Sequence, residues 1–279
     1  MSVASMLPDK SQEEINPILP DDVRGKDGLM YCGKCGKPKQ FRYSLFGFER
    51  VVPCVCKCRA LVLEKQKQEK DYEEQMRIID RLKDSSMMAS KFRNAKFSEY
   101  VLRKENEKAY KIAVTYTKRF PEMKEKNQGL LFYGPVGTGK SHTAACIANA
   151  LMDQCISVVM TSFVKILQDI QKCEDEGNYL AILNSATLLI IDDLGAERNT
   201  EYALEKIYNV IDSRIRTNKP MVLTTNLELS EMLDCSDIRY GRIYDRILES
   251  CYPVEMPGKS FRIIEAATRF EDMKNLIEE

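Results

Sequence analysis

Beyond residue 90, runs of hydrophobic residues alternate regularly with amphipathic segments. Five short apolar runs have the length of strands, at 129–133, 156–160, 187–191, 221–225 and 252–256. Segments with helical spacing of apolar residues lie at 105–120, 141–152, 162–172, 200–216, 230–233 and 239–251. Short apolar strands that alternate with helices are typical of a mostly parallel sheet covered on both faces. We therefore predict an α/β domain over residues 91–279, with a polar loop at 121–128.

The first ninety residues follow a different pattern. Residues 1–28 carry prolines among polar and acidic residues, which predicts a loose arm with a short helix near 12–15. Residues 29–59 are rich in cysteine, glycine and lysine, as expected for a small module held together by a metal. Residues 60–86 contain neither glycine nor proline and favour a linker helix. The serine-rich stretch after this helix is the expected boundary, so residues 1–90 form the N-terminal part.

Composition limits the range of functions without choosing one. Hydrophobic residues make up 44% of the 279 residues and charged residues 30%, as in an ordinary globular protein. Lys+Arg and Asp+Glu both number 42, so net charge argues neither for nor against nucleic acid. No apolar run approaches the about 18–20 residues that cross a bilayer, and no signal-peptide pattern opens the chain. We expect a cytoplasmic protein with no membrane partner.

A glycine-rich motif lies between the first predicted strand and the helix that follows it. It reads Gly134, Pro135, Val136, Gly137, Thr138, Gly139, Lys140 and Ser141. This is the phosphate-binding pattern G-x-x-x-x-G-K-[ST], in which backbone N–H groups and a helix N-terminus surround phosphate oxygens. We expect Lys140 to reach the β and γ phosphates of ATP and Ser141 to hold Mg²⁺. His142 adjoins this nucleotide-binding set, and packing is the favoured role of its imidazole.

Two further polar groups follow predicted strands. Asp192 and Asp193 end the run Leu188–Ile191, and Asn226 follows Thr224 and Thr225 at the end of the next strand. The carboxyl ends of parallel strands share one edge of a sheet, where open α/β sheets bind ligands. We predict that Asp192 holds the Mg²⁺ ion, that Asp193 orients or deprotonates the attacking water, and that Asn226 contacts the γ-phosphate or this water.

Five of the ten cysteines fall between residues 32 and 58. Cys32 and Cys35 form a CxxC turn, and Cys54, Cys56 and Cys58 follow after eighteen intervening residues. Four thiolates from two such turns make a closed tetrahedral zinc site. We favour Cys32, Cys35, Cys56 and Cys58 as the zinc ligands, with Cys54 as the alternative ligand. A redox pair of cysteines is the other interpretation.

Basic and aromatic residues interleave in the same module. Residues 33–59 contain seven Lys or Arg and one acidic residue, Glu49. Phe41, Tyr43, Phe46 and Phe48 lie among them. Aromatic and basic side chains together can stack bases and track a nucleic-acid backbone. The same aromatic residues can form the core of a small module, and that interpretation is the one we favour.

The order of these motifs resembles the AAA+ ATPases. Several details narrow the resemblance to the DnaC/DnaI/IstB group of bacterial helicase loaders and transposition ATPases, over about residues 90–265. They are Gly139–His142, Leu188–Gly195, Thr224–Asn226, Arg242–Ile247 and Gly258–Arg262. The resemblance implies an AAA+ P-loop sheet flanked by helices, without the helical lid domain that many members carry. One departure is Asp193, where many AAA+ proteins have Glu, which argues against a high intrinsic turnover.

The resemblance also implies roles for two arginines and for the partners. Arg246 looks like the arginine finger that completes the ATP site of a neighbouring subunit, with Arg242 as the alternative, so a homo-oligomer is expected. Arg262 looks like the sensor-2 arginine. The expected function is ATP-dependent loading of a hexameric replicative DNA helicase onto single-stranded DNA, with the helicase docked on the N-terminal module. The alternative is an IstB-like transposition ATPase that regulates a transposase.

Overall fold

The computed structural model describes residues 12–45, 47–173, 175–196 and 200–277. Internal contacts divide the chain into two compact units, Met1–Met76 and Arg77–Glu279. The division falls inside helix α2 (Lys57–Ser85), so this helix contributes residues to both units. The domain limits 1–90 and 91–279 stay a prediction. Among the described residues, no helix combines the length and the apolar character that crossing a membrane requires.

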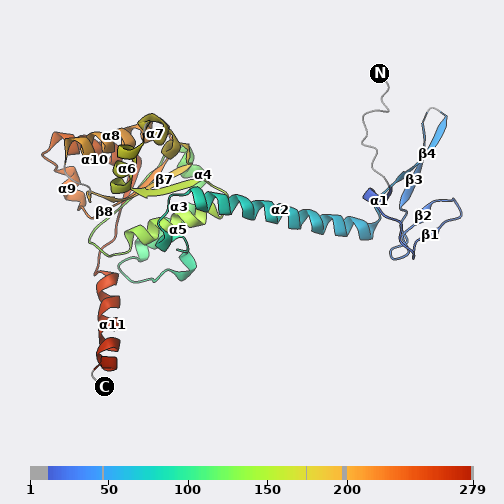
Figure 1. Cartoon of the computed structure of the whole chain (residues 1–279), viewed down its shortest axis with the longest axis horizontal. Helices are drawn as coiled ribbons and strands as arrows, with labels where there is room; N and C mark the ends of the chain where they lie inside the picture. The colour runs from blue at the N-terminus through green and yellow to red at the C-terminus, as the bar shows by residue number, and fades with distance from the viewer. Residues whose placement is uncertain (1–11, 46, 174, 197–199, 278–279) are drawn as a thin grey trace. The chain divides into compact units, whose positions relative to one another are not determined.

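A five-stranded parallel sheet forms the centre of the larger unit (Figure 1). Its strands lie in the order β6-β7-β8-β5-β9. They span Gly129–Tyr133 (β5), Val158–Ser162 (β6), Leu188–Leu194 (β7), Met221–Thr225 (β8) and Cys251–Glu255 (β9). The predicted α/β fold with a parallel sheet is therefore confirmed. The order places β5 and β7 on either side of β8, so the motifs that follow these three strands share one edge of the sheet.

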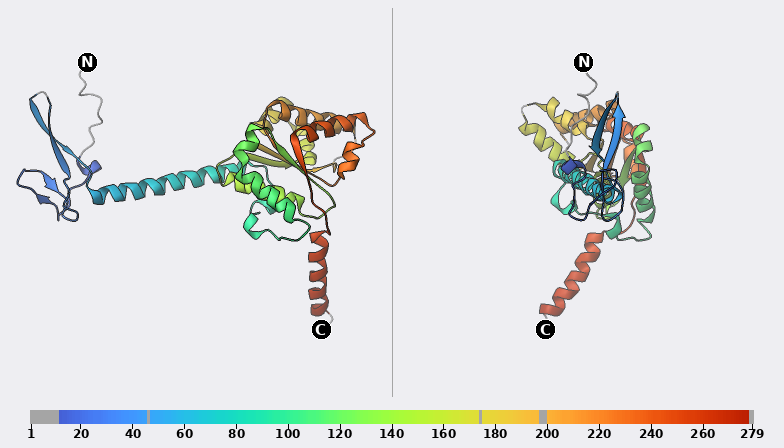
Figure 2. Two further views of the ribbon diagram at one scale, coloured as in Figure 1. Left: turned by 180° about the vertical axis from the view of Figure 1, so that it is seen from behind. Right: turned by 90° about the vertical axis from the view of Figure 1, so that its right-hand side faces the viewer.

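Helices cover both faces of the sheet, as the two views of Figure 2 show. They are α3 (Glu107–Lys118), α4 (Phe120–Glu125), α5 (Lys140–Met152), α6 (Phe163–Lys172), α7 (Glu176–Ser185), α8 (Glu201–Arg216), α9 (Leu229–Leu233) and α10 (Ile238–Ser250). The last helix, α11 (Phe261–Ile277), extends away from the sheet. Side chains of β5 alternate between the two cores: Leu130 and Phe132 pack with α3 and α5, whereas Leu131 packs with α6, α8 and α10. This alternation explains why the whole strand is apolar.

Local sequence accounts for several helix boundaries. The hydroxyl of Ser162 accepts a hydrogen bond from the N–H of Lys165, so Ser162 caps α6. The predicted polar loop at 121–128 is wrong over its first part, because α4 spans Phe120–Glu125 with Pro121 in its first turn. Proline is tolerated there, since the first helical N–H groups have no partner within the helix. Helix α7, capped by Asp175, was not predicted.

The smaller unit consists of short elements. Helix α1 (Gln12–Ile15) is followed by two antiparallel pairs, β1 (Val23–Arg24) with β2 (Met30–Tyr31), and β3 (Gln40–Leu45) with β4 (Phe48–Pro53). Two 3₁₀ turns, Ser90–Phe92 and Phe97–Glu99, belong to the larger unit and precede α3.

Buried polar contacts fasten this smaller unit. The ammonium of Lys39 is buried, forms an ion pair with Asp22, and donates to the carbonyl of Pro17 at 2.7 Å. The predicted aromatic core is wrong for Phe41 and Phe48, which are 59% and 75% exposed. Phe46, the third phenylalanine of that prediction, lies outside the described residues. Cysteines and the Lys39 ion pair fill the interior instead.

Candidate functional site

The glycine-rich loop joins β5 to α5 and follows a tight path. Gly134, Gly137 and Gly139 all have positive φ values, of 125°, 81° and 95°. A Cβ atom on Gly137 would lie 2.1 Å from the hydroxyl oxygen of Ser260, so this position excludes any other residue type. The N–H of Phe261 donates to the carbonyl of Gly137 at 2.8 Å. The segment before α11 is therefore packed directly on the loop.

Lys140 is buried at the start of α5. Its ammonium donates to the carbonyls of Gly134 and Pro135, each at 2.7 Å. Burial lowers the pKa of Lys140, and the nearby negative charges of Asp193 and Asp192 act in the opposite direction. The lysine and both carboxylates thus lie close enough to interact, on the same edge of the sheet.

The tip of β7 is held by β8 in an irregular conformation. The register between the two strands shifts between Ile191 and Leu194, and Asp193 has a φ of 61°. The hydroxyl of Thr224 donates to Oδ1 of Asp192 at 2.6 Å and accepts from the N–H of Asp193 at 2.9 Å. The side-chain amide of Asn226 donates to Oδ1 of Asp193 at 3.1 Å. Thr224 belongs to the Thr224–Asn226 motif, but the sequence analysis assigned it no role of its own. In the structure it orients the carboxylate of Asp192 and holds the backbone of Asp193.

These residues surround one cavity of about 410 Å³. Of the predicted site residues, the cavity lining includes Val136, Gly137, Gly139, Lys140, Ser141, His142, Asp193, Asn226 and Arg262. Gly134, Pro135, Thr138 and Asp192 are not part of this lining. Pro135 and Thr138 are joined by a hydrogen bond of 3.0 Å from the threonine hydroxyl to the proline carbonyl. The half-buried His142 ring lies 5.7 Å from the ring of Tyr100, in keeping with a packing role.

The opposite wall of the cavity was not predicted. It is formed by Phe92, Tyr100, Val101 and Asn106, from the segment before α3, and by Phe261. The hydroxyls of Tyr100 and Thr143 lie 2.7 Å apart, which ties this segment to α5. The guanidinium of Arg103 lies 3.9 Å from the centre of the Phe261 ring. Aromatic and apolar side chains here offer a surface for a planar base, and no spacing pattern in the sequence marks them.

The two candidate finger arginines lie on α10 and do not line this cavity. Arg246 forms ion pairs with Glu249 at 3.0 Å and with Asp212 at 3.8 Å. Its hydrogen bond to Glu249 raises the pKa of Arg246. Arg242 is exposed. Neither arginine therefore contributes to the cavity wall of its own chain, and the finger role stays a prediction.

The cysteines of the smaller unit gather as a candidate metal centre. The Sγ atoms of Cys32, Cys35 and Cys56 all lie within 4.8 Å of one another. Backbone hydrogen bonds from Lys37 and Cys58 lower the pKa of Cys35 to about 6, and a hydrogen bond with Cys35 raises the pKa of Cys58 to about 11. The thiol of Cys54 instead donates to the carbonyl of Pro38 at 3.3 Å. Three of the four sulfurs favoured from sequence thus lie together, and the fourth, that of Cys58, is hydrogen-bonded to Cys35. The thiol of Cys54 points elsewhere.

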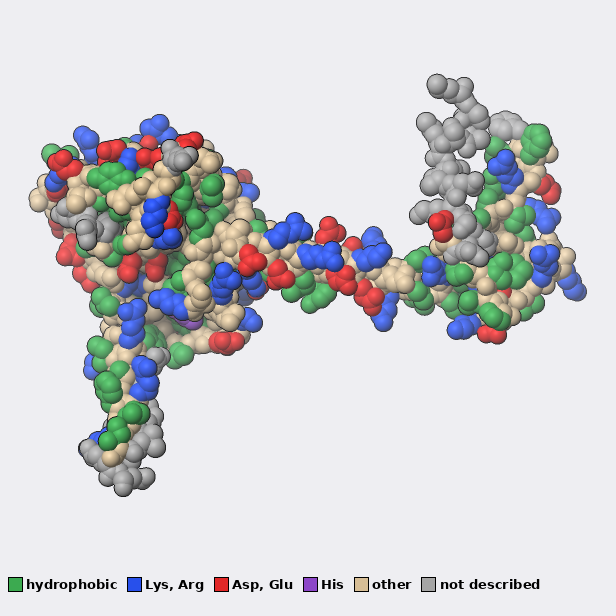
Figure 3. Space-filling view, viewed as in Figure 1, with side chains coloured by type: hydrophobic (Ala, Val, Ile, Leu, Met, Phe, Trp, Pro, Cys, Tyr) green, Lys and Arg blue, Asp and Glu red, His purple; other side chains and the backbone are tan. Residues whose placement is uncertain are grey.

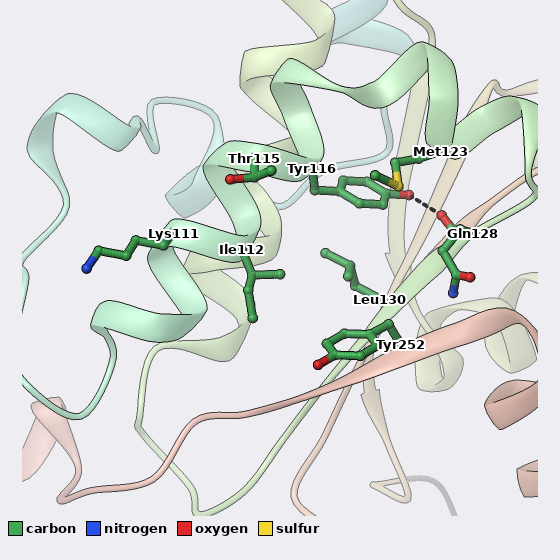
Figure 4. A pocket seen from close by; sticks show the side chains of 8 residues that line it. All are labelled: Lys111, Ile112, Thr115, Tyr116, Met123, Gln128, Leu130 and Tyr252. Atoms are coloured by element: carbon green, nitrogen blue, oxygen red, sulfur yellow. Dashed lines mark hydrogen bonds between the residues drawn. The ribbon is translucent and has the colours of Figure 1, made fainter.

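A second hollow, of about 420 Å³, lies at the edge strand β9 (Figure 4). Its lining is mostly apolar and includes Ile112, Tyr116, Leu130 and Tyr252. The Tyr116 hydroxyl donates to the carbonyl of Gln128 at 3.0 Å. No predicted site residue lines it, so it is separate from the cavity at the glycine-rich loop.

A match to a protein-family model identifies the family of this chain. Residues 62–268 match the model of the IstB-like ATP binding protein family, which is well over half of the chain. The chain belongs to this family. It is a P-loop ATPase, and ATP binding is the property that the family name records.

Three curated relatives illustrate the range of this IstB-like ATPase family. The phage-like element PBSX protein XkdC of Bacillus subtilis is 26% identical over 261 residues, covering 88% of this chain and 90% of the relative. The replicative helicase loader DnaI of the same organism is 25% identical over 150 residues, 49% of this chain and 48% of DnaI. An ATP-binding protein from an insertion sequence of Mycobacterium tuberculosis, Rv3427c, is 24% identical over 143 residues, covering 50% of this chain and 57% of the relative.

The fold agrees with this assignment. A crystal structure of DnaI superposes with a TM-score of 0.53 at 23% identity, and the match covers 62% of this chain and 93% of that one. The IstB-like ATPase therefore has the sheet and helix arrangement of a DnaI-type AAA+ domain.

Proposed function

We propose that this ATPase loads a replicative DNA helicase onto single-stranded DNA. The proposal is supported by the similarity to the loader DnaI over about half of each chain. The observation that carries it is the cavity in which the phosphate loop, Asp193, Asn226 and Arg262 converge, because such a site changes its contacts when a γ-phosphate is bound or lost. ATP would then act as a switch that holds and releases the helicase.

In this proposal, Ser141 and Asp192 hold Mg²⁺ beside the phosphates of ATP. Thr224 fixes Asp192 in place, and Asn226 fixes Asp193. Asp193 orients the attacking water, while Lys140 and Arg262 neutralise charge on the phosphates. Lys140 first has to leave the two loop carbonyls that it contacts now.

The sulfurs of Cys32, Cys35, Cys56 and Cys58 are the proposed zinc ligands. Their number and type fit a closed structural site. Zinc would hold the module of residues 29–59 in the shape that docks on the hexameric helicase. The role of the metal here is structural, because four thiolates leave no open coordination position.

The test combines capture of a partner with ATP turnover. The full chain is expected to capture the replicative helicase of its host from a purified mixture in the presence of ATP and Mg²⁺. Lys140→Ala should abolish ATP binding or turnover. Capture of the helicase by this variant should then no longer depend on added nucleotide. Normal turnover in this variant would refute the site assignment.

The alternative is an IstB-like ATPase that regulates a transposase, favoured by the similarity to the insertion-sequence protein Rv3427c. The same capture experiment with a purified transposase of this class separates the two proposals. Capture of the transposase and failure to capture the helicase would establish the alternative.

A further inference from the structure

The hairpin of β3 and β4 has two different faces. Directly paired residues of an antiparallel ribbon lie on the same face. One face therefore carries the pairs Phe41 with Val52, Tyr43 with Arg50, and Leu45 with Phe48. The other face carries Gln40 with Pro53, Arg42 with Val51, and Ser44 with Glu49. The first face is apolar and aromatic except for one arginine.

This aromatic face is open. Phe41, Leu45 and Phe48 are 59%, 57% and 75% exposed. The two strands pair only with each other in the described part of the chain, as a separate two-stranded sheet. A ribbon of two strands is marginally stable in water, and burying these side chains would stabilise it. Large apolar side chains that instead stay exposed together mark a binding surface.

The module that carries this face is basic. Residues 33–59 contain seven basic residues and one acidic residue. Lys39 is buried in its ion pair with Asp22, and five of the others are exposed: Lys34, Lys37, Arg42, Arg50 and Lys57. Arg50 is exposed and lies directly across from Tyr43 on the aromatic face. Figure 3 shows hydrophobic and basic side chains side by side over the hairpin. An anionic ligand with flat apolar groups matches this combination.

We propose that the aromatic face of this hairpin is a stacking surface for single-stranded nucleic acid. Alternate residues of a strand project from one face about 7 Å apart, so the rings of Phe41 and Tyr43 can each take a separate base. Arg50 on the same face then contacts a phosphate. This inference deepens the proposed function, because it assigns to the smaller unit the DNA strand that the helicase must encircle.

The experiment measures binding of a labelled oligothymidylate to the full chain by fluorescence anisotropy. Phe41→Ala and Phe48→Ala are each expected to weaken binding about tenfold or more, as loss of one stacked base predicts. Arg50→Gln should weaken binding and also reduce its salt dependence by about one unit of slope. Because these side chains are exposed, zinc content and melting temperature should stay unchanged.

The matched control is Val51→Ala. Val51 is an exposed apolar residue, 48% accessible, on the opposite face of the same ribbon. This variant is expected to bind the oligonucleotide as the unmodified protein does. Equal binding by the Phe41→Ala, Phe48→Ala double variant and by the unmodified protein would overturn the proposal.

A second readout separates this inference from the proposed function. Capture of the helicase and ATP turnover are expected to survive in the double variant. Loss of helicase capture with unchanged DNA binding would show that the face docks a protein, which also overturns the inference. If the unmodified protein captures no helicase but the double variant loses DNA binding, the proposed function fails and the stacking surface stands.

Discussion

At the scale of single residues, Thr224 links the carboxylate of Asp192 to the backbone of Asp193. Its buried hydroxyl donates to Asp192 and accepts from the backbone N–H of Asp193. Asp193 is also one of five non-glycine residues with positive φ among those described, a conformation that costs free energy and persists only when neighbours enforce it. Thr224 and Asn226 are the neighbours that do so. Thr224 is therefore a positioning residue. It lies on β8, the neighbour of the strand β5 that leads into the phosphate loop.

Thr224→Val should lower kcat for ATP hydrolysis by about ten- to a hundredfold, since a small misplacement of the reacting groups has effects of this size. The Mg²⁺ concentration for half-maximal activity should rise as well, because Asp192 loses its hydrogen bond. Thr224→Ser keeps the hydroxyl and should retain most of the activity. Steady-state kinetics over a range of Mg²⁺ measures both quantities. An unchanged kcat in Thr224→Val, at a comparable melting temperature, would contradict this role.

At the scale of secondary-structure elements, Arg214 ties helix α8 to its surroundings. Its fully buried guanidinium donates to the carbonyls of Ala186 at 2.9 Å, Thr187 at 3.0 Å and Pro220 at 2.8 Å. Burial lowers the pKa of Arg214 to about 10, so it remains charged at neutral pH. These carbonyls lie at the end of α7, before β7, and before β8. One side chain thus aligns the two strands that carry the site residues.

Arg214→Met should lower the free energy of unfolding by about 3 kcal/mol or more, because several buried carbonyls lose their donor. Lys219→Met is the matched control. Lys219 donates to the carbonyls of Asn184 and Ser185 from a partly exposed position, so its loss should cost less than about 1 kcal/mol. Urea denaturation of both variants measures the difference. Equal destabilisation by the two substitutions would show that the buried arginine has no special role.

The elements that could be predicted from the sequence are those in which buried residues recur at a regular spacing. The strands of the sheet were predictable because both of their faces are covered and every residue is apolar, as in Leu188–Ile191. Helix α7 was missed, since its apolar residues are consecutive rather than spaced as on one helix face, and its segment contains a glycine. The second cavity wall was missed for another reason. Tyr100 and Phe261 are far apart in the chain, and their segments meet only in the folded chain, where Arg103 lies over the Phe261 ring.

The cysteine residues show a further limit of prediction from sequence. Their spacing gave five candidates for four metal-ligand positions but did not decide which cysteine is the spare one. The direction of the Cys54 thiol, toward the carbonyl of Pro38, depends on how β4 returns beside Lys39. The exposure of Phe41 and Phe48 was unpredictable in the same way, because an alternating strand reads alike whether its apolar face is covered by the same chain or by a ligand.

At the scale of the whole molecule, the chain combines a cysteine-bearing unit with an ATPase unit, and each of them is compact. Cys35→Ser should therefore release zinc and unfold residues 29–59 while leaving ATP affinity of the larger unit nearly unchanged. Zinc content, measured with a colorimetric chelator, and ATP binding, measured by titration calorimetry, check the two halves of this prediction. Cys54→Ser is the control, because its thiol points away from the cluster, and it should retain zinc. A collapse of ATP binding in Cys35→Ser would show that the units do not fold independently.

The proposed oligomer makes a sharper prediction, because it divides one ATP site between two chains. Lys140→Ala removes the phosphate contact of a chain but leaves its Arg246 intact, whereas Arg246→Ala does the reverse. Each variant alone should be inactive. In an equal mixture, about a quarter of the head-to-tail interfaces pair an intact ATP site with an intact arginine, so about a quarter of the normal turnover should return. For this to happen, Arg246 has to exchange Asp212 and Glu249 for the γ-phosphate of its neighbour.

Mixing Lys140→Ala with Arg242→Ala is the parallel experiment. Recovery of turnover in that mixture, with full activity of Arg246→Ala alone, would assign the finger to Arg242. Activity of both arginine variants on their own would instead mean that the ATPase completes its site within one chain.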